Sequence, residues 1–203
     1  MADSREKSAP SSAASWRGKD IMRSLPKRTH RIPTQARAEQ REKFTLVSQF
    51  LAPIGSILKR YFGESQGFKS RRNLAISYHI REAVAGASPD FTMDYQKVII
   101  AEGELLGPEN PSAAPQATAA IKLDWEDNSG QGLAKSDDML MVVTYNTTRN
   151  LFDTREGTKK RSQATYLLEL PGTWLGDTVE CWIAFVAADG KDNSSSMGEM
   201  VLV

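Results

Sequence analysis

Residues 166–185 read YLLELPGTWLGDTVECWIAF, and this stretch sets the fold class. Apolar side chains recur at every second position from 166 to 170, and again from 179 to 185. The dipeptide Pro171-Gly172 between the two runs is typical of a turn. Alternation of this kind is the pattern of a strand that buries one face. The stretch therefore predicts two β-strands separated by a turn.

Short apolar runs continue this pattern through the rest of the C-terminal half. Further strands are expected at residues 98–100, 121–125, 139–145 and 200–203. The segment after Gly103 holds three prolines and is expected to be a loop. Turn residues separate the runs, and no helical pattern lies between them. The sequence thus predicts an antiparallel β-sandwich over residues 91–203.

A helical region is predicted over residues 34–90. Thr34 is a suitable N-cap for a first helix that runs to Ala52 without Gly or Pro. Pro53 interrupts it, and a short second helix is expected to end at Gly63. A third helix is expected from Ser70 to about Ala85, ended by Gly86. Side chains expected to face inward are Phe44, Val47, Phe50 and Leu51 in the first helix and Leu74 and Tyr78 in the third.

Residues 1–33 form a basic arm. Residues 1–15 are small and polar, and we expect them to be disordered without a partner. Two prolines and irregularly spaced basic residues in 16–33 exclude a long helix, so this part is predicted to be an extended segment that docks on a partner. The residues expected to make the docking contacts are Trp16, Arg17, Lys19, Arg23, Lys27, Arg28 and Arg31.

Charge is distributed unevenly along the chain. Residues 1–81 hold 17 Lys or Arg and 6 Asp or Glu, a balance of +11, whereas residues 82–203 hold 9 and 19, a balance of −10. The positive end is suited to nucleic acid, to an acidic partner, or to the negative end of another copy. We favour protein docking, because no known nucleic-acid-binding fold accompanies the arm.

Composition argues against several classes of site. Cys181 is the single cysteine, so an internal disulfide is excluded, and with only His30 and His79 a zinc site is excluded as well. His30 lies beside Arg28 and Arg31 with no orienting acid nearby, and His79 is expected in the middle of a helix as a partly buried or surface side chain, so neither indicates a catalytic triad. We therefore expect no enzyme activity and no cofactor. No apolar run reaches the roughly 20 residues of a membrane span, and residues 1–20 lack the apolar region of a secretory signal.

Two further groups of residues suggest weaker alternatives. Acidic residues around a turn contain enough oxygen ligands for calcium, although Ser129 stands where a calcium loop needs glycine, and solvated loop residues are the preferred interpretation. These residues are Asp124, Glu126, Asp127, Asn128, Asp137 and Asp138. Trp174 and Trp182 are expected in the core, with a carbohydrate-stacking platform as the alternative.

Two resemblances extend this interpretation. Leu170 to Thr173, Val179 to Ala187 and Ser194 to Ser196 resemble the last third of a fibronectin type III module, a fold of the immunoglobulin-like class, although Trp174 to Asp177 replace the tyrosine expected there. Over nearly the whole chain, a second set of residues resembles a family of bacterial proteins that has no established activity. This set is Gly18, Arg23-Ser24, Pro26, Pro33-Thr34, Gln35, Gln40-Arg41, Lys43-Phe44, Gly103 and Trp125. The resemblance implies a basic N-terminal segment joined to a fibronectin-like half, and similar basic segments occur in proteins that look like phage virion components.

The sequence therefore favours an α+β protein that is a non-enzymatic subunit of a repetitive assembly, such as a virion, a tail-like structure or a filament. Its partners are expected to be other copies or other structural proteins, docked through the arm. The alternatives are a nucleic-acid-binding accessory protein and a carbohydrate-binding surface module.

Overall fold

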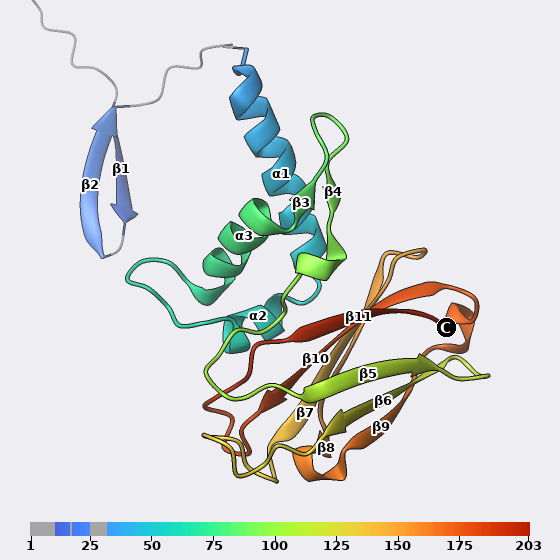
Figure 1. Ribbon diagram of the computed structural model, residues 1–203. Helices are drawn as coiled ribbons and strands as arrows, with labels where there is room; N and C mark the ends of the chain where they lie inside the picture. The colour runs from blue at the N-terminus through green and yellow to red at the C-terminus, as the bar shows by residue number, and fades with distance from the viewer. Residues whose placement is uncertain (1–10, 17, 25–31) are drawn as a thin grey trace, which may run out of the picture. The chain divides into compact units, whose positions relative to one another are not determined.

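The computed structural model of the chain describes residues 11–16, 18–24 and 32–203 (Figure 1). The chain divides into two compact units, Met1–Gln35 and Ala36–Val203. Among the described residues, no helix combines the length and the hydropathy that crossing a membrane requires.

A β-hairpin makes up most of the described part of the first unit. Strand β1 (Ser11–Trp16) pairs antiparallel with β2 (Lys19–Ser24), and Ala14 lies opposite Ile21. Gly18 in the connection has a φ of 74°, a conformation that glycine adopts without steric cost. The prediction that residues 11–15 are disordered is wrong, because these small residues pair with β2, and Gly18 is the turn signal that accompanies the pairing. The absence of helix from residues 18–24 agrees with the prediction.

Three helices open the second unit, close to their predicted positions: α1 (Gln35–Leu51), α2 (Gly55–Tyr61) and α3 (Arg71–Glu82). Ser70 caps α3, because its Oγ accepts a hydrogen bond from the Asn73 N–H at 3.3 Å. Helix α3 ends at Glu82, earlier than expected, since Val84–Ala85 (β3) pairs with Thr92–Met93 (β4). Gly86 lies in the loop of that hairpin with a φ of 85°.

Two antiparallel sheets form the sandwich. The three-stranded sheet has the order β5-β6-β9, and the four-stranded sheet has the order β11-β10-β7-β8 (Figure 1). The bounds are β5 (Glu109–Pro115), β6 (Ala120–Glu126), β7 (Met139–Asn146), β8 (Leu151–Lys160), β9 (Thr165–Glu169), β10 (Thr178–Val186) and β11 (Met197–Leu202). The predicted α+β fold with an antiparallel β-sandwich is confirmed.

One hydrophobic core fills the space between the two sheets. Alternate residues of β6 and β10 meet there, as the alternation in the sequence predicts. Trp125 of β6 contacts Phe185 of β10 edge to face, with ring centres 5.8 Å apart. The buried members are Leu105, Ile121, Leu123, Trp125, Leu140, Val142, Leu168, Leu170, Trp174, Val179, Cys181, Ile183, Phe185, Val201 and Val203.

A second core lies between the helices and the other face of the four-stranded sheet. Phe50 of α1 contacts Tyr145 of β7 with ring centres 5.1 Å apart, and Trp182 of β10 is buried in the same cluster. Strands β7 and β10 are thus covered on both faces, which explains why Met139 to Tyr145 is almost continuously apolar. Phe44, predicted to face inward, is half exposed because it lies before the part of α1 that meets the sheet.

Three segments differ from the sequence-based expectation. Val98 and Ile100 are buried, but residues 98–100 form no strand, since the Ile100 N–H donates to Ser196 Oγ at 2.8 Å. Strand β5 occupies the proline-rich segment that was expected to be a loop. It is an edge strand, where a missing N–H is tolerated. Strand β8 is also an edge strand and is rich in charged residues, so it lacks the alternation that reveals its neighbours.

Candidate docking surfaces

The β1–β2 hairpin presents basic and apolar side chains together. Residues two apart on a strand share a face, so Lys19, Ile21 and Arg23 lie on one side of β2 and Met22 lies on the other. Ile21 is 38% exposed and Met22 is 79% exposed. A two-stranded hairpin is at best marginally stable in water, and both of its outer backbone edges can pair with another chain. The hairpin is therefore a candidate docking surface.

The predicted docking residues fall into two groups. Lys19 and Arg23 are described and exposed on β2, and Trp16 ends β1 directly opposite Lys19 in the strand register. The other four lie outside the described residues: Arg17, Lys27, Arg28 and Arg31. The structure thus places Lys19 and Arg23 on the same face of strand β2. The irregular spacing of the basic residues in the sequence did not predict this arrangement.

A seam between the two sheets forms a second candidate surface. At this seam the edge strands β5 and β11 come together, and the Ala113 N–H donates to the Glu199 carboxylate at 2.8 Å. The pairing of β5 with β6 shifts register between Glu109 and Ser112, and Asn110 there has a φ of 45°. A groove of about 400 Å³ opens at the seam. It is lined by Asn110, Pro111, Ser112, Ala113, Leu123, Cys181, Ile183, Met197, Gly198 and Glu199.

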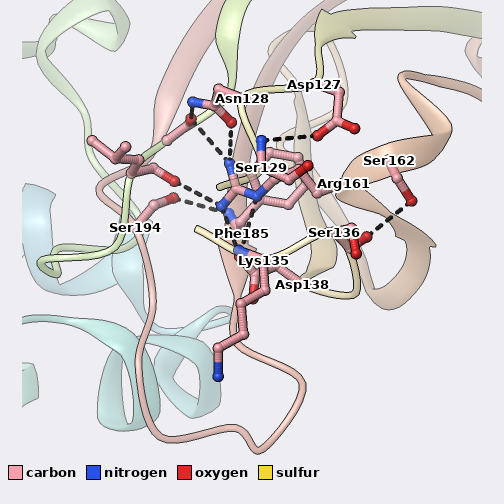
Figure 2. Close-up of polar contacts among 12 residues, drawn as sticks. Asp127, Asn128, Ser129, Lys135, Ser136, Asp138, Arg161, Ser162, Phe185 and Ser194 are labelled. Atoms are coloured by element: carbon pink, nitrogen blue, oxygen red, sulfur yellow. Dashed lines mark hydrogen bonds and ion pairs between the residues drawn. The ribbon is translucent and has the colours of Figure 1, made fainter. Parts of the chain in front are cut away.

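A buried ion pair fixes the loops at one end of the sandwich (Figure 2). Arg161, which follows β8, lies with Nη2 3.0 Å from Oδ2 of Asp138, which precedes β7, and both side chains are fully buried. Arg161 Nη1 also donates to Asn128 Oδ1 at 2.6 Å. Burial lowers the pKa of Arg161, and the hydrogen bond to Asp138 opposes that shift. The Arg161–Asp138 pair thus connects three loops of the sandwich: the loop before β5, the loop after β6 and the loop after β8.

Other contacts complete the environment of Arg161. Its Nη2 donates to the Leu106 carbonyl at 2.9 Å, and its guanidinium carbon lies 4.0 Å from the centre of the Phe185 ring. The Trp125 indole N–H donates to the Arg161 carbonyl at 2.7 Å. Sequence reasoning missed this pair, because Asp138 and Arg161 are 23 residues apart and nothing local marks either as buried.

Three of the acidic residues considered for calcium have protein partners instead, namely Asp124, Asp127 and Asp138. Asp124 accepts from Thr165 Oγ1 at 2.7 Å and pairs with Lys122, and these contacts lower its pKa. Asp127 accepts from the Ser129 N–H at 3.0 Å, and Asp138 belongs to the Arg161 pair. In the described part of the chain, no three metal-ligating side chains gather at one point.

A polar groove of about 640 Å³ lies beside α3, between the α2–α3 connection and the β10–β11 connection. Its charged lining side chains are evenly divided between the two signs. They are Lys69, Arg71, Arg81 and Lys191 with Glu64, Glu102, Glu104 and Asp192. The groove therefore has no excess of charge that would select an anion or a cation.

His79, Cys181, Trp174 and Trp182 are buried. His79 was expected to be at most partly buried, but it is fully buried, and its Nδ1 lies 2.7 Å from the Ala75 carbonyl of its own helix. Burial raises the pKa of the Cys181 thiol to about 12. Trp174 and Trp182 are core residues as expected, which rules them out as a carbohydrate-stacking platform. His30 lies outside the described residues.

Acidification is expected to destabilise the fold through His79. Burial lowers the pKa of His79, and the backbone at Ala75 and at Ile99 opposes this shift. The Nε2 atom is buried and forms no hydrogen bond in the described part of the chain. The pKa of His79 in the folded state lies below the unfolded value of about 6.5. Neutral His79 therefore contributes its full stabilisation above about pH 6.5, and this stabilisation is lost as the pH falls toward the folded-state pKa. Urea unfolding at pH 7 and pH 5 should show a larger loss for the natural protein than for His79→Phe. Equal losses would contradict this assignment.

Comparison with known proteins places the chain in a family. The sequence pattern described as Family of unknown function (DUF6266) matches residues 4–198. The chain belongs to this family. No curated protein matches the DUF6266 chain in sequence. Among solved structures, the fn3 domain of human collagen alpha-1(XX) chain is similar, with 9% identity and a TM-score of 0.36. The alignment covers 57% of the DUF6266 chain and 87% of that domain.

Proposed function

We propose that this DUF6266 protein is a non-enzymatic subunit of a repetitive assembly, such as a virion, a tail-like structure or a filament, and that its N-terminal arm docks on a neighbouring structural protein. The observation that carries the proposal is the β1–β2 hairpin. It belongs to a separate unit and exposes Ile21 and Met22 beside Lys19 and Arg23. Ordering a backbone costs about 1–2 kcal/mol per residue, which two short strands recover poorly by themselves. A partner surface would supply the missing burial.

Charge supports a second copy as that partner. Residues 1–33 hold 8 Lys or Arg and 3 Asp or Glu, a balance of +5, and residues 82–203 have a balance of −10, so the arm of one copy and the sandwich of another attract each other. Association of this kind is steered by charge and weakens with salt, because the Debye length falls from about 10 Å at 0.1 M to about 3 Å at 1 M. Repeated head-to-tail docking generates a ring or an open filament.

Charge reversal on the hairpin tests this function. The double variant Lys19→Glu, Arg23→Glu should weaken association at least about tenfold, because like charges would then meet across the interface. Light scattering after size-exclusion chromatography gives the mass, and unchanged urea unfolding would show that the sandwich still folds. The matched control is Lys59→Glu, Lys191→Glu, which alters net charge equally at exposed positions outside the hairpin. Equal assembly by the hairpin variant and the natural protein would refute the proposed function.

A further inference from the structure

The hairpin and the β5–β11 seam have complementary chemistry. On β2, the apolar side chain of Ile21 stands between two cations, Lys19 and Arg23, on the same face. At the seam, apolar side chains of Leu123, Ile183 and Met197 line the groove together with the Glu199 carboxylate. Thus each surface combines an apolar centre with charge, and the charges have opposite sign.

A pair of like charges adds to the negative potential beside the seam. Glu109 of β5 lies directly opposite Glu126 of β6 in the strand register, and both residues are exposed. Like charges in directly opposed positions destabilise a sheet. No ion pair involves either carboxylate within the described part of the chain. Because Glu109 precedes Asn110 of the groove lining, a cation docked at the seam would relieve this repulsion.

The groove has room for a side chain of the hairpin. Its volume of about 400 Å³ exceeds that of any single apolar side chain, and Met197 at its edge is 45% exposed. Apolar surface buried on docking contributes roughly 25 cal/mol per Å² before the costs of association. Strand β5 offers no free backbone donor on this edge, because its Ala113 N–H already donates to Glu199 and Pro111 and Pro115 carry no N–H. The seam therefore offers apolar contact and negative charge together.

We propose that the β5–β11 seam of one copy receives the β1–β2 hairpin of a neighbouring copy, with Ile21 in the groove and Lys19 and Arg23 beside the seam carboxylates. This assignment rests on the proposed function, and it names the receiving surface. It makes the contact heterologous, because the hairpin and the seam are different surfaces of the chain.

A charge swap tests the assignment. The variant Glu109→Lys, Glu126→Lys replaces one like-charge pair by another, so the sandwich should keep its stability while association weakens at least about tenfold. Mixed in equal amounts with the hairpin variant Lys19→Glu, Arg23→Glu, it should form a complex again, because the natural hairpin of the seam variant meets the natural seam of the hairpin variant and the reversed hairpin meets the reversed seam. Undiminished assembly of the seam variant, or a mixture that stays monomeric, would overturn the assignment.

Introduced cysteines locate the contact independently. Ile21→Cys mixed with Met197→Cys should yield roughly tenfold or more disulfide-linked dimer than Ile21→Cys mixed with Leu151→Cys, because docked thiols have a high effective concentration. Leu151 is a matched control, since it is 53% exposed on β8, the opposite edge of the same sheet. Native Cys181 is buried, and each single variant alone reports any reaction with it. Equal yields from the two mixtures would overturn the assignment.

The outcomes distinguish the two proposals. If the natural protein assembles but the seam variant assembles equally well, the seam assignment fails and the proposed function stands. If the natural protein stays monomeric at every concentration, both fail. A disulfide formed within a single chain carrying both Ile21→Cys and Met197→Cys would show that the chain's own hairpin occupies the seam, and this result would also overturn docking between copies.

Discussion

Replacing Arg161 with methionine is expected to lower the free energy of unfolding by about 3–5 kcal/mol, because the change leaves the Asp138 carboxylate buried without its charge partner. The same change removes the hydrogen bonds to Asn128 and to the Leu106 carbonyl. The three loops that Arg161 connects would then no longer share a hydrogen-bond partner. Urea unfolding, with the midpoint and the slope both fitted, measures the loss.

Two further variants distinguish the loss of the buried ion pair from the loss of a partly exposed ion pair. Arg155→Met removes a partly exposed pair with Asp153 and should cost about 0–1 kcal/mol. The double variant Asp138→Asn, Arg161→Met should lose less than the sum of its single changes, because it leaves no unpaired buried charge. Asp138 Oδ1 already has no hydrogen-bond partner in the described structure, so the pair is not fully satisfied. A loss below about 1 kcal/mol for Arg161→Met would contradict the role assigned to the pair.

Gly103→Ala is expected to destabilise the second unit by about 1–3 kcal/mol through steric overlap. A Cβ at this position would collide with the backbone carbonyl oxygen of Asn193, which cannot move aside like a flexible side chain. That oxygen accepts from the Leu105 N–H at 3.2 Å, and Asn193 Nδ2 donates to the Tyr61 carbonyl at 2.9 Å. The substitution therefore disturbs the contact between the end of α2 and the β10–β11 connection.

Gly107→Ala is the matched control in the same segment. Its Cβ would be 3.6 Å from the nearest atom, Ser195 O, which is ordinary van der Waals contact. Replacement of glycine at a compatible position stabilises a protein by about 0.4–1 kcal/mol, so the two alanine variants should differ in sign. Thermal unfolding of both variants checks this expectation. Equal melting temperatures would show that the backbone near Asn193 adapts without cost.

Much of the fold follows from local patterns. The change of apolar period from helical to alternating near residue 90 correctly predicted helices before it and antiparallel strands after it. The strands buried on one face, such as β6, were evident from alternation. Two of the four edge strands were not, because β5 contains prolines and β8 is mostly charged, so neither buries a regular apolar face. Pattern alone therefore identified the centres of the sheets and missed two of their edges.

The candidate surfaces were less predictable. Basic composition indicated the arm, and the hairpin places Lys19 and Arg23 on one face of it, but the composition gave no sign of pairing between β1 and β2. The seam depends on the meeting of residues 110–113 and 197–199, which are far apart in the sequence. The Arg161 pair depends in the same way on contacts across loops. Such surfaces form only in the tertiary structure, and no periodic pattern in the local sequence predicts them.

The mass of the natural protein in solution tests the central claim most directly. Light scattering should be recorded over a range of concentrations at low and high salt, with electron micrographs of the largest species. We predict a mass that rises with concentration to multiples of 22.4 kDa and falls as salt increases. A mass of 22.4 kDa at every concentration, together with nucleic-acid binding that weakens steeply with salt, would contradict assembly and favour a nucleic-acid-binding protein instead.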